Sequence, residues 1–128
     1  MALAFLMPVA ILMACGEDTT LGPVNAVEVT NSVDNFLFRV SNLENISDTR
    51  SYTWENTGTQ ATIDITQSIV GGSVILTIRD DAGTVVHQED IADDNDTDTA
   101  VGVAGSWAIE VRLQNTTGGF DFRVQKKT

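Results

Sequence analysis

Hydrophobic and polar residues alternate with a period of two along most of the chain after residue 23. This period places successive side chains on opposite faces of a strand, and no segment shows the 3.6-residue period of an amphipathic helix. Within Asn35 to Leu43, for example, Phe36, Phe38 and Val40 fall on one face and Arg39 on the other. The pattern predicts strands at Ala26 to Asn31, Asn35 to Leu43, Asp48 to Thr57, Ala61 to Ile69, Ser73 to Arg79, Thr84 to Ile91, Thr99 to Val103 (the weakest), Ser106 to Leu113 and Phe120 to Val124.

Turn-forming residues separate these segments, notably Gly71-Gly72 and Gly118-Gly119. Asp80-Asp81-Ala82-Gly83 is a strong hairpin signal, because acidic residues suit the early turn positions and Gly83 can take a positive φ. Short strands joined by turns are typical of all-β folds. We therefore predict an antiparallel two-sheet β-sandwich, jelly-roll-like, with eight to nine short strands.

The first 13 residues contain no charged side chain, and their hydrophobic run is interrupted only by Pro8. A run of this length is shorter than the roughly 20 residues of a membrane span and is typical of a signal peptide. It ends in Leu12-Met13-Ala14-Cys15, which resembles the lipobox of bacterial lipoproteins, although no Lys or Arg precedes the run. The resemblance implies that the Cys15 thiol receives a diacylglyceryl group and that the chain is cut before it. The alternative interpretation is a buried core element with an incidental cysteine.

This resemblance implies three parts: a lipoprotein signal peptide at 1–14, a polar tether at 15–23 and a β-sandwich domain at 24–128. The protein would be exported and anchored to a bacterial membrane through Cys15, facing the periplasm or the cell surface. Gly16 occupies the position where aspartate retains lipoproteins at the inner membrane, which favours the outer membrane. Cys15 is the only cysteine, so the domain has no internal disulfide.

The chain has 18 Asp and Glu residues against 7 Lys and Arg, for a formal net charge of -11. Such a surface is a poor partner for nucleic acid, because phosphate binding depends on clustered Lys and Arg. The acidity is interpreted as a device for solubility, or as adaptation to a salty medium that screens the repulsion. A dedicated role in cation binding is the alternative.

Two hairpin-like segments resemble a known family. Gly105-Ser106-Trp107-Ala108-Ile109-Glu110-Val111, followed by Gly118-Gly119-Phe120-Asp121-Phe122-Arg123-Val124, is similar to the closing hairpin of the bacterial pre-peptidase C-terminal domain. The segment from Gly72 to Val85 is similar to the family's central hairpin. The resemblance implies a jelly-roll module with a role in secretion or substrate binding, sometimes with bound calcium. Family members are usually appended to an enzyme, and this chain has no enzyme domain attached.

The acidic segment 93–98 is a candidate calcium site, because carboxylates at alternate positions can converge on a hard cation. The EF-hand pattern is not met, since Thr99 stands where the turn glycine belongs and Gly105 where the closing glutamate belongs. A solvated loop is the alternative interpretation. The candidate calcium ligands are Asp93, Asp94, Asn95, Asp96 and Asp98, and no other cofactor is predicted.

Few residues suit catalysis. His87 is the only histidine, and its parity with Val85 and Ile91 favours a packed or edge residue over a catalytic base. Tyr52 and Trp54 are candidates for an aromatic platform that stacks on sugar rings, with core packing as the alternative. For Trp107, core packing is the favoured interpretation.

Two hypotheses about function follow. The first is a non-catalytic, lipid-anchored binding module of the cell envelope, with a polysaccharide or a protein as its ligand and calcium as a candidate cofactor. The second is a structural or assembly lipoprotein that docks a partner subunit through an exposed sheet edge. An exposed aromatic patch or calcium dependence would favour the first, and a stable envelope complex would favour the second.

Overall fold

The computed structural model describes residues 20–93 and 96–128. Two short 3₁₀ turns, η2 (Pro23–Asn25) and η3 (Ile91–Asp93), accompany the strands. None of the helical segments in these ranges is long and apolar enough to cross a membrane. The strands are β1 (Glu28–Ser32), β2 (Asn35–Asn56), β3 (Ala61–Gln67), β4 (Gly71–Arg79), β5 (Val85–Asp90), β6 (Thr97–Asp98) and β7 (Gly105–Lys126).

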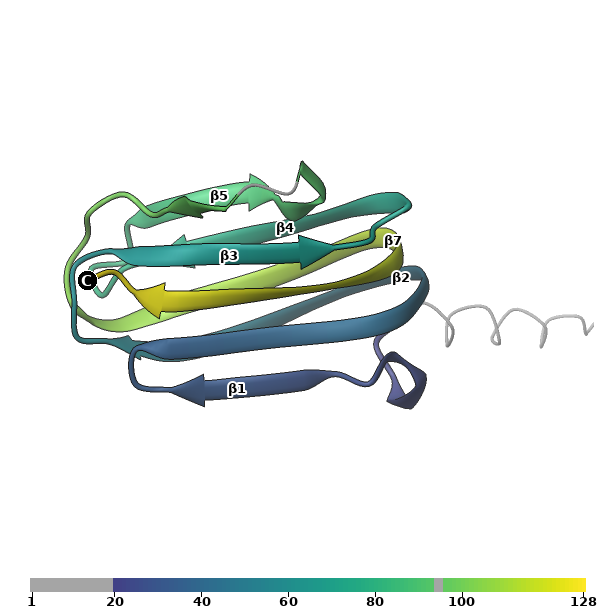
Figure 1. Cartoon of the computed structure of the whole chain (residues 1–128), viewed down its shortest axis with the longest axis horizontal. Coiled ribbons are helices and arrows are strands. Elements are labelled where there is room, and N and C mark those ends of the chain that lie inside the picture. Colours follow the sequence, from purple (N-terminus) through teal and green to yellow (C-terminus); the bar gives the residue numbers. More distant parts are fainter. Residues whose placement is uncertain (1–19, 94–95) are drawn as a thin grey trace, which may run out of the picture.

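Strands β2 and β7 pair with each other along almost their whole length, and both turn over from one layer of the sandwich into the other (Figure 1). One layer contains β1, the first half of β2, the second half of β7, β3 and β6. The second layer contains the second half of β2, the first half of β7, β4 and β5. All pairs are antiparallel, which confirms the predicted two-sheet sandwich. The described part has seven strands rather than eight or nine short ones, because β2 and β7 each supply two of the predicted segments.

The turnover of β2 and β7 has a local cause in their middle residues. The β2–β7 register shifts three times between Val40 and Asp48, and such bulges bend a strand. Asn42, Asn45 and Asn115 have φ values of 53°, 55° and 50°. Asparagine tolerates this left-handed region better than most residues, because its short side chain can bond to the local backbone. The bends therefore lie where the sequence permits positive φ.

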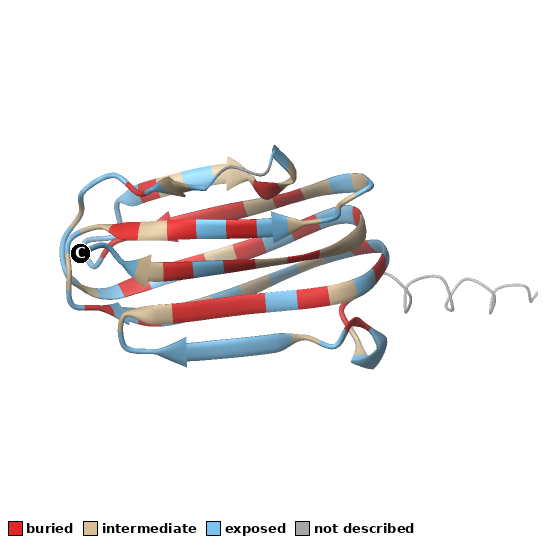
Figure 2. Cartoon of the chain, viewed as in Figure 1, coloured by how far each residue is buried: buried red, intermediate tan, exposed pale blue. Residues whose placement is uncertain are grey.

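The core lies between the two layers and is formed by the inward residues of each strand (Figure 2). Phe36, Phe38 and Phe122 are fully buried, and the Phe38 and Phe122 rings stack with centroids 5.7 Å apart. Trp54 and Trp107 meet edge to face at 6.0 Å. The predicted alternation is confirmed, since Arg39 is exposed beside buried Phe38 and Val40.

One predicted strand is wrong. The sequence pattern predicted a strand at Thr99 to Val103, whereas the structure has only a two-residue strand, β6, just before it. Successive amides of this segment bond to different parts of the fold: Thr99 to the carbonyl of Ala61, Ala100 to that of Val86, and Gly102 to that of Thr59. A strand needs one neighbour along its length. The segment is therefore a loop that joins the two layers.

The free edge of β2 in the second layer is covered by β1. The Asn31 side chain donates to the Thr53 carbonyl at 2.9 Å, and the Trp54 indole donates to the Ser32 carbonyl at 3.0 Å. The first bond occupies a carbonyl of β2 that an incoming strand would otherwise use, and the second ties Trp54 of β2 to the end of β1. Strand β1 itself is exposed at all five residues and forms the outer edge of its layer.

Part of the segment expected to be a tether packs on the sandwich. Leu21 belongs to the hydrophobic core, and its amide donates to the Asp48 carboxylate at 3.1 Å. Pro23 opens η2, whose last residue, Asn25, is buried. Leu21, three residues before the expected domain boundary, is therefore part of the folded domain.

The two ends of the sandwich differ in construction. At one end, which we call the folded end, β2 and β7 turn over from one layer into the other. This end contains the bends at 41–47 and 114–119, the turn at 68–70 and η2. The loop end contains the turns at 33–34, 57–60, 80–84 and 99–104, together with the C-terminal residues 126–128. Thr20 lies at the folded end, whereas the C-terminus lies at the loop end (Figure 1). The segment that carries Cys15 therefore joins the domain at the folded end.

Candidate functional site

The aromatic platform predicted from Tyr52 and Trp54 is corrected by the structure. Trp54 is fully buried, and Tyr52 packs on the core with its ring 5.3 Å from that of Phe36. Both residues alternate inward along β2, so their rings face the opposite sheet rather than the solvent. The alternative interpretation, core packing, holds for both, and Trp107 is confirmed as a core residue.

The candidate calcium site is only partly described, because Asp94 and Asn95 lie outside the described residues. Asp96 accepts a hydrogen bond from the Ile65 amide at 2.8 Å. Asp98 accepts one from the Thr62 hydroxyl at 2.9 Å and forms an ion pair with Lys127. Asp93 ends η3. Within 20–93 and 96–128, no three His, Cys, Asp or Glu side chains are grouped closely enough to hold a metal ion. The calcium site stays a prediction without support from these contacts.

His87 is a mostly buried residue of the edge strand β5. It pairs in register with Ile78 and its Nε2 atom lies 3.3 Å from a carboxylate oxygen of Glu89. Inward-pointing polar side chains on an edge strand discourage further strands from joining the sheet. This position confirms the interpretation of His87 as a packed edge histidine. Cys15, the predicted lipidation site, lies outside the described residues.

The loop end is organised around the carboxylate of Asp80, which is buried. One of its oxygens accepts hydrogen bonds from the amides of Ala82 and Thr84 at 3.0 and 2.9 Å. The other accepts from the Val103 amide at 2.8 Å. Because Val103 belongs to the 99–104 loop, this one side chain ties that loop to the predicted hairpin turn. Gly83 has the expected positive φ, 85°.

The neighbouring turns are held in the same way. Asp34, in the β1–β2 turn, accepts hydrogen bonds from the amide and hydroxyl of Thr57 at 2.7 and 2.8 Å. Asp81 accepts one from the Ser106 amide at 3.1 Å, and the Trp107 indole donates to the Val103 carbonyl at 2.8 Å. The acidic side chains of this end are thus used to fix backbone. The loops form a preorganised surface.

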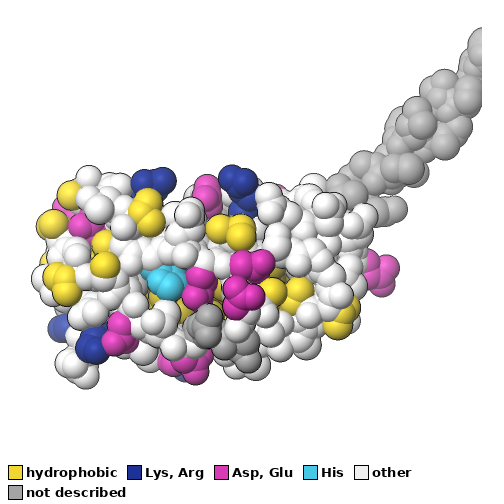
Figure 3. Space-filling view, turned by 90° about the horizontal axis from the view of Figure 1, so that it is seen from above, with side chains coloured by type: hydrophobic (Ala, Val, Ile, Leu, Met, Phe, Trp, Pro, Cys, Tyr) yellow, Lys and Arg dark blue, Asp and Glu magenta, His cyan; other side chains and the backbone are white. Residues whose placement is uncertain are grey.

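Four of the side chains that this scaffold presents to solvent are valines. Val101 is 70% exposed, Val103 51% and Val33 61%, and Val85 is also exposed. We call these four residues the valine surface. Figure 3 shows hydrophobic side chains at the left end of the molecule, with basic ones beside them. Exposed apolar residues that gather on one end mark an interaction surface more often than scattered ones do.

Basic residues accompany the valine surface in an otherwise acidic protein. Arg79 lies beside the 80–84 turn, where it donates to the Gly83 carbonyl at 3.2 Å. Lys126 and Lys127 end the chain at the same end. Three of the seven Lys and Arg residues therefore border the valine surface, although the net charge of the chain is -11.

Three carboxyl groups of the loop end and its edge have pKa values below the ordinary 3.8. For Asp34 the main cause is the hydrogen bond from the Thr57 amide. For Asp80, burial raises the pKa, and the donations from Thr84, Val103 and Ala82 together outweigh it. For Asp98 the hydrogen bond from Lys127 is the largest cause of the lowered pKa. All three groups favour the ionised form in the folded chain.

These lowered pKa values predict a pH-dependent effect of Asp34→Asn. The substitution keeps the shape of the side chain and tolerates the φ of 65° at this position, but removes the charge. A carboxyl with a lowered pKa in the folded chain stabilises it at pH values above 3.8, and this contribution is lost as the pH falls through the lowered value. We expect the variant to unfold at lower urea concentration than the parent at pH 7.

The difference between the two chains should close as the pH falls through the lowered pKa of Asp34. Urea titrations at pH 7, 4 and 2.5 measure it directly, and comparing the two chains cancels the titration of all other groups. A difference that grows as the pH falls would contradict the assigned direction.

Comparisons with known proteins do not identify the chain. No protein-family model matches it, so the resemblance to the pre-peptidase C-terminal domain stays a prediction. No curated protein matches it either. A solved structure described as "CBM4 structure and function" aligns with a TM-score of 0.42 and 13% identity, over 81% of this chain and 80% of that one. This degree of likeness is too low to transfer a ligand or a binding site.

Proposed function

We propose that the protein is a non-catalytic binding module of the bacterial cell envelope, anchored through a lipid on Cys15, and that its ligand is a protein held at the loop end. The observation that carries this proposal is the valine surface, a set of exposed apolar side chains on loops fixed by buried or hydrogen-bonded carboxylates. The residues of the valine surface do not resemble a catalytic centre. They resemble the apolar centre of a protein interface.

The position of the N-terminal segment supports an outward-facing loop end. Thr20 lies at the folded end, five positions after Cys15 in the chain. An extended chain covers about 3.3 to 3.6 Å per residue, so a lipid on Cys15 would hold the folded end within about 18 Å of the membrane. The valine surface would then point away from that membrane, toward partners in the envelope.

The residues around the valine surface favour a protein over a sugar chain. The four residues of the valine surface have neither an aromatic ring for a sugar to stack on nor a hydrogen-bonding side chain for its hydroxyl groups. The adjoining Arg79, Lys126 and Lys127 favour a partner with acidic residues around its own apolar patch. Calcium has no part in this proposal.

The proposal predicts that the partner is lost when the valine surface is made polar. The full chain would carry an affinity tag at its C-terminus, be recovered from detergent-solubilised envelopes, and be compared with the double variant Val101→Ser and Val103→Ser. We expect at least a tenfold loss of the co-purified protein, because two apolar contacts leave the interface.

The matched control is Val70→Ser, which changes a valine that is 81% exposed at the folded end. It should retain the partner. Equal recovery of the partner with the parent, the double variant and Val70→Ser would overturn the proposal. A partner whose recovery falls only with Val70→Ser would also overturn it. Recovery from the parent should also fall at high salt, since the basic border of the surface is exposed.

A further inference from the structure

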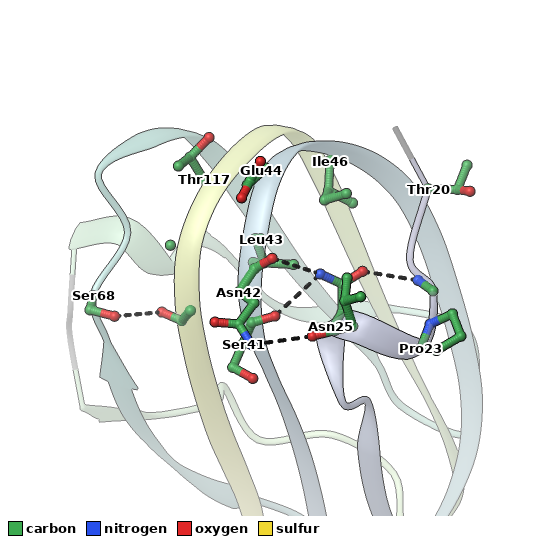
Figure 4. A pocket seen from close by; sticks show the side chains of 14 residues that line it. Thr20, Pro23, Asn25, Ser41, Asn42, Leu43, Glu44, Ile46, Ser68 and Thr117 are labelled. Atoms are coloured by element: carbon green, nitrogen blue, oxygen red, sulfur yellow. Dashed lines mark hydrogen bonds between the residues drawn. The ribbon is translucent and has the colours of Figure 1, made fainter. Parts of the chain in front are cut away.

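A concave feature lies at the folded end, at the opposite end of the molecule from the valine surface. It is an open hollow of about 1030 Å³ between η2 and the bends of β2 and β7 (Figure 4). Ligand sites for small molecules occupy volumes of this order. No sequence motif marks this hollow, because its wall is built from bends and turns that are distant in the chain.

The wall of the hollow is fixed by the buried side chain of Asn25. Its amide nitrogen donates to the carbonyls of Ser41 and Asn42 at 3.2 and 3.0 Å, and its oxygen accepts from the Gly22 amide at 2.9 Å. The Asn42 side chain donates back to the Val24 carbonyl at 3.3 Å. Three hydrogen bonds thus hold η2 against the bend and fix this wall of the hollow.

The opposite wall consists largely of backbone. Gly118 has a φ of 128°, and a Cβ atom there would lie 2.2 Å from the Ser68 carbonyl oxygen. At Gly119, a Cβ atom would lie 3.3 Å from the Val40 carbonyl oxygen. The two glycines let β7 approach the 68–70 turn closely and add no side chain of their own to this wall.

The groups that line the hollow select for neutral, hydroxyl-rich ligands. Thr20, Ser41, Ser68 and Thr117 supply hydroxyls, Asn42 an amide and Glu44 a carboxylate. The described lining includes no Lys, Arg or His side chain, so an anion would meet no opposite charge in a chain of net charge -11. Leu43, Ile46 and Pro23 add the apolar contact that the carbon face of a sugar ring requires.

From this lining we infer that the hollow is a binding site for a neutral oligosaccharide. The site is independent of the valine surface, because it lies at the other end of the sandwich and shares no residue with it. It recognises its ligand through hydroxyl, amide and carboxylate groups without an aromatic platform. Such polar recognition gives weak binding, with a Kd of about 10 μM to 1 mM.

Gly22→Trp tests the assignment by filling the hollow. Gly22 lines it, has an ordinary φ of -143°, and has no atom within 4 Å of the place of an added Cβ. The full chain in detergent would be titrated by calorimetry with neutral hexasaccharides of glucose, mannose and N-acetylglucosamine, and with a hexuronic acid of equal length. We expect at least one neutral hexasaccharide to bind, the hexuronic acid not to bind, and Gly22→Trp to weaken binding at least tenfold.

Thr30→Trp, on the exposed strand β1, is the control for an added indole, and it should bind the sugar like the parent. The inference is overturned if no neutral hexasaccharide binds, if the hexuronic acid binds as well as the neutral ones, or if Gly22→Trp binds like the parent. Partner recovery through the valine surface, measured on the same variants, should be unaffected by Gly22→Trp. A failure of one site is thereby distinguished from a failure of the other.

Discussion

Replacing Gly118 by alanine is expected to lower the free energy of unfolding by about 3 kcal/mol or more. Two effects combine at this position. The φ of 128° is strained for any residue with a Cβ atom, and the new methyl group would lie 2.2 Å from the Ser68 carbonyl oxygen and 2.9 Å from the Ile69 Cα. Both neighbours are backbone atoms, so relief requires the β7 bend to move away from the 68–70 turn. Chemical denaturation of the purified chain measures the effect.

Two other glycines separate these effects. Gly83→Ala has a similarly positive φ of 85° but nothing within 4 Å of the added atom, so it should lose only about 1 kcal/mol. Gly22→Ala has neither strain nor a clash, and its stability should stay within about 0.5 kcal/mol of the parent. If Gly118→Ala were no more destabilising than Gly83→Ala, the close approach of β7 to the 68–70 turn would be wrong.

Asp80→Asn should lower the Tm by roughly 10 °C. An asparagine at this position keeps one oxygen, which can still accept from the Ala82 and Thr84 amides. Its amide nitrogen would then replace the oxygen that lies 2.8 Å from the Val103 amide, so that two donors face each other. The Val103 amide loses its partner, and the 99–104 loop is no longer tied to the hairpin turn.

Asp81→Asn provides the control for Asp80→Asn. Asp81 is exposed and accepts a single amide hydrogen bond, from Ser106, which an asparagine oxygen can also accept. Its Tm should change by less than about 2 °C. Differential scanning calorimetry of both variants at pH 7 makes the comparison. Equal effects of the two substitutions would mean that Asp80 does not organise the loop end.

The inward faces of the strands were predictable from the sequence alone. The alternation around Phe38 and Trp107 requires only a period of two, and every such inward residue is buried in the structure. The turn at Asp80 to Gly83 was equally predictable, because its residue types match a single kind of hairpin connection. Local signals of this kind need no knowledge of the partner strand.

The continuity of β2 and β7 could not be predicted in the same way. The polar, Asn-containing stretch between Leu43 and Asp48 has the composition of a turn, and the sequence does not show that its backbone continues to pair with β7 across the bend. The strand predicted at Thr99 to Val103 was wrong for the opposite reason. Its residue types suit a strand, but three of its amides donate hydrogen bonds to carbonyls in three separate parts of the fold.

The candidate site was only partly visible in the sequence. Tyr52 and Trp54 were considered as ligand contacts because large aromatic residues serve both cores and sugar platforms, and periodicity cannot separate the two roles. The valine surface was not considered, since isolated valines in loops carry no motif. Its signal arises only when the Asp80 carboxylate brings Val85, Val101 and Val103 to the same end of the sandwich.

The most direct test of the account is site-specific photo-crosslinking in cells that produce the full chain. A benzophenone amino acid would be placed at residue 101 in the valine surface and, as a control, at residue 70 of the folded end. The account predicts one crosslinked protein of defined mass from position 101, little or none from position 70, and loss of the membrane-associated product in a Cys15→Ser chain. Crosslinks that are absent from position 101, or equally abundant from both positions, would contradict a partner-binding role for the loop end.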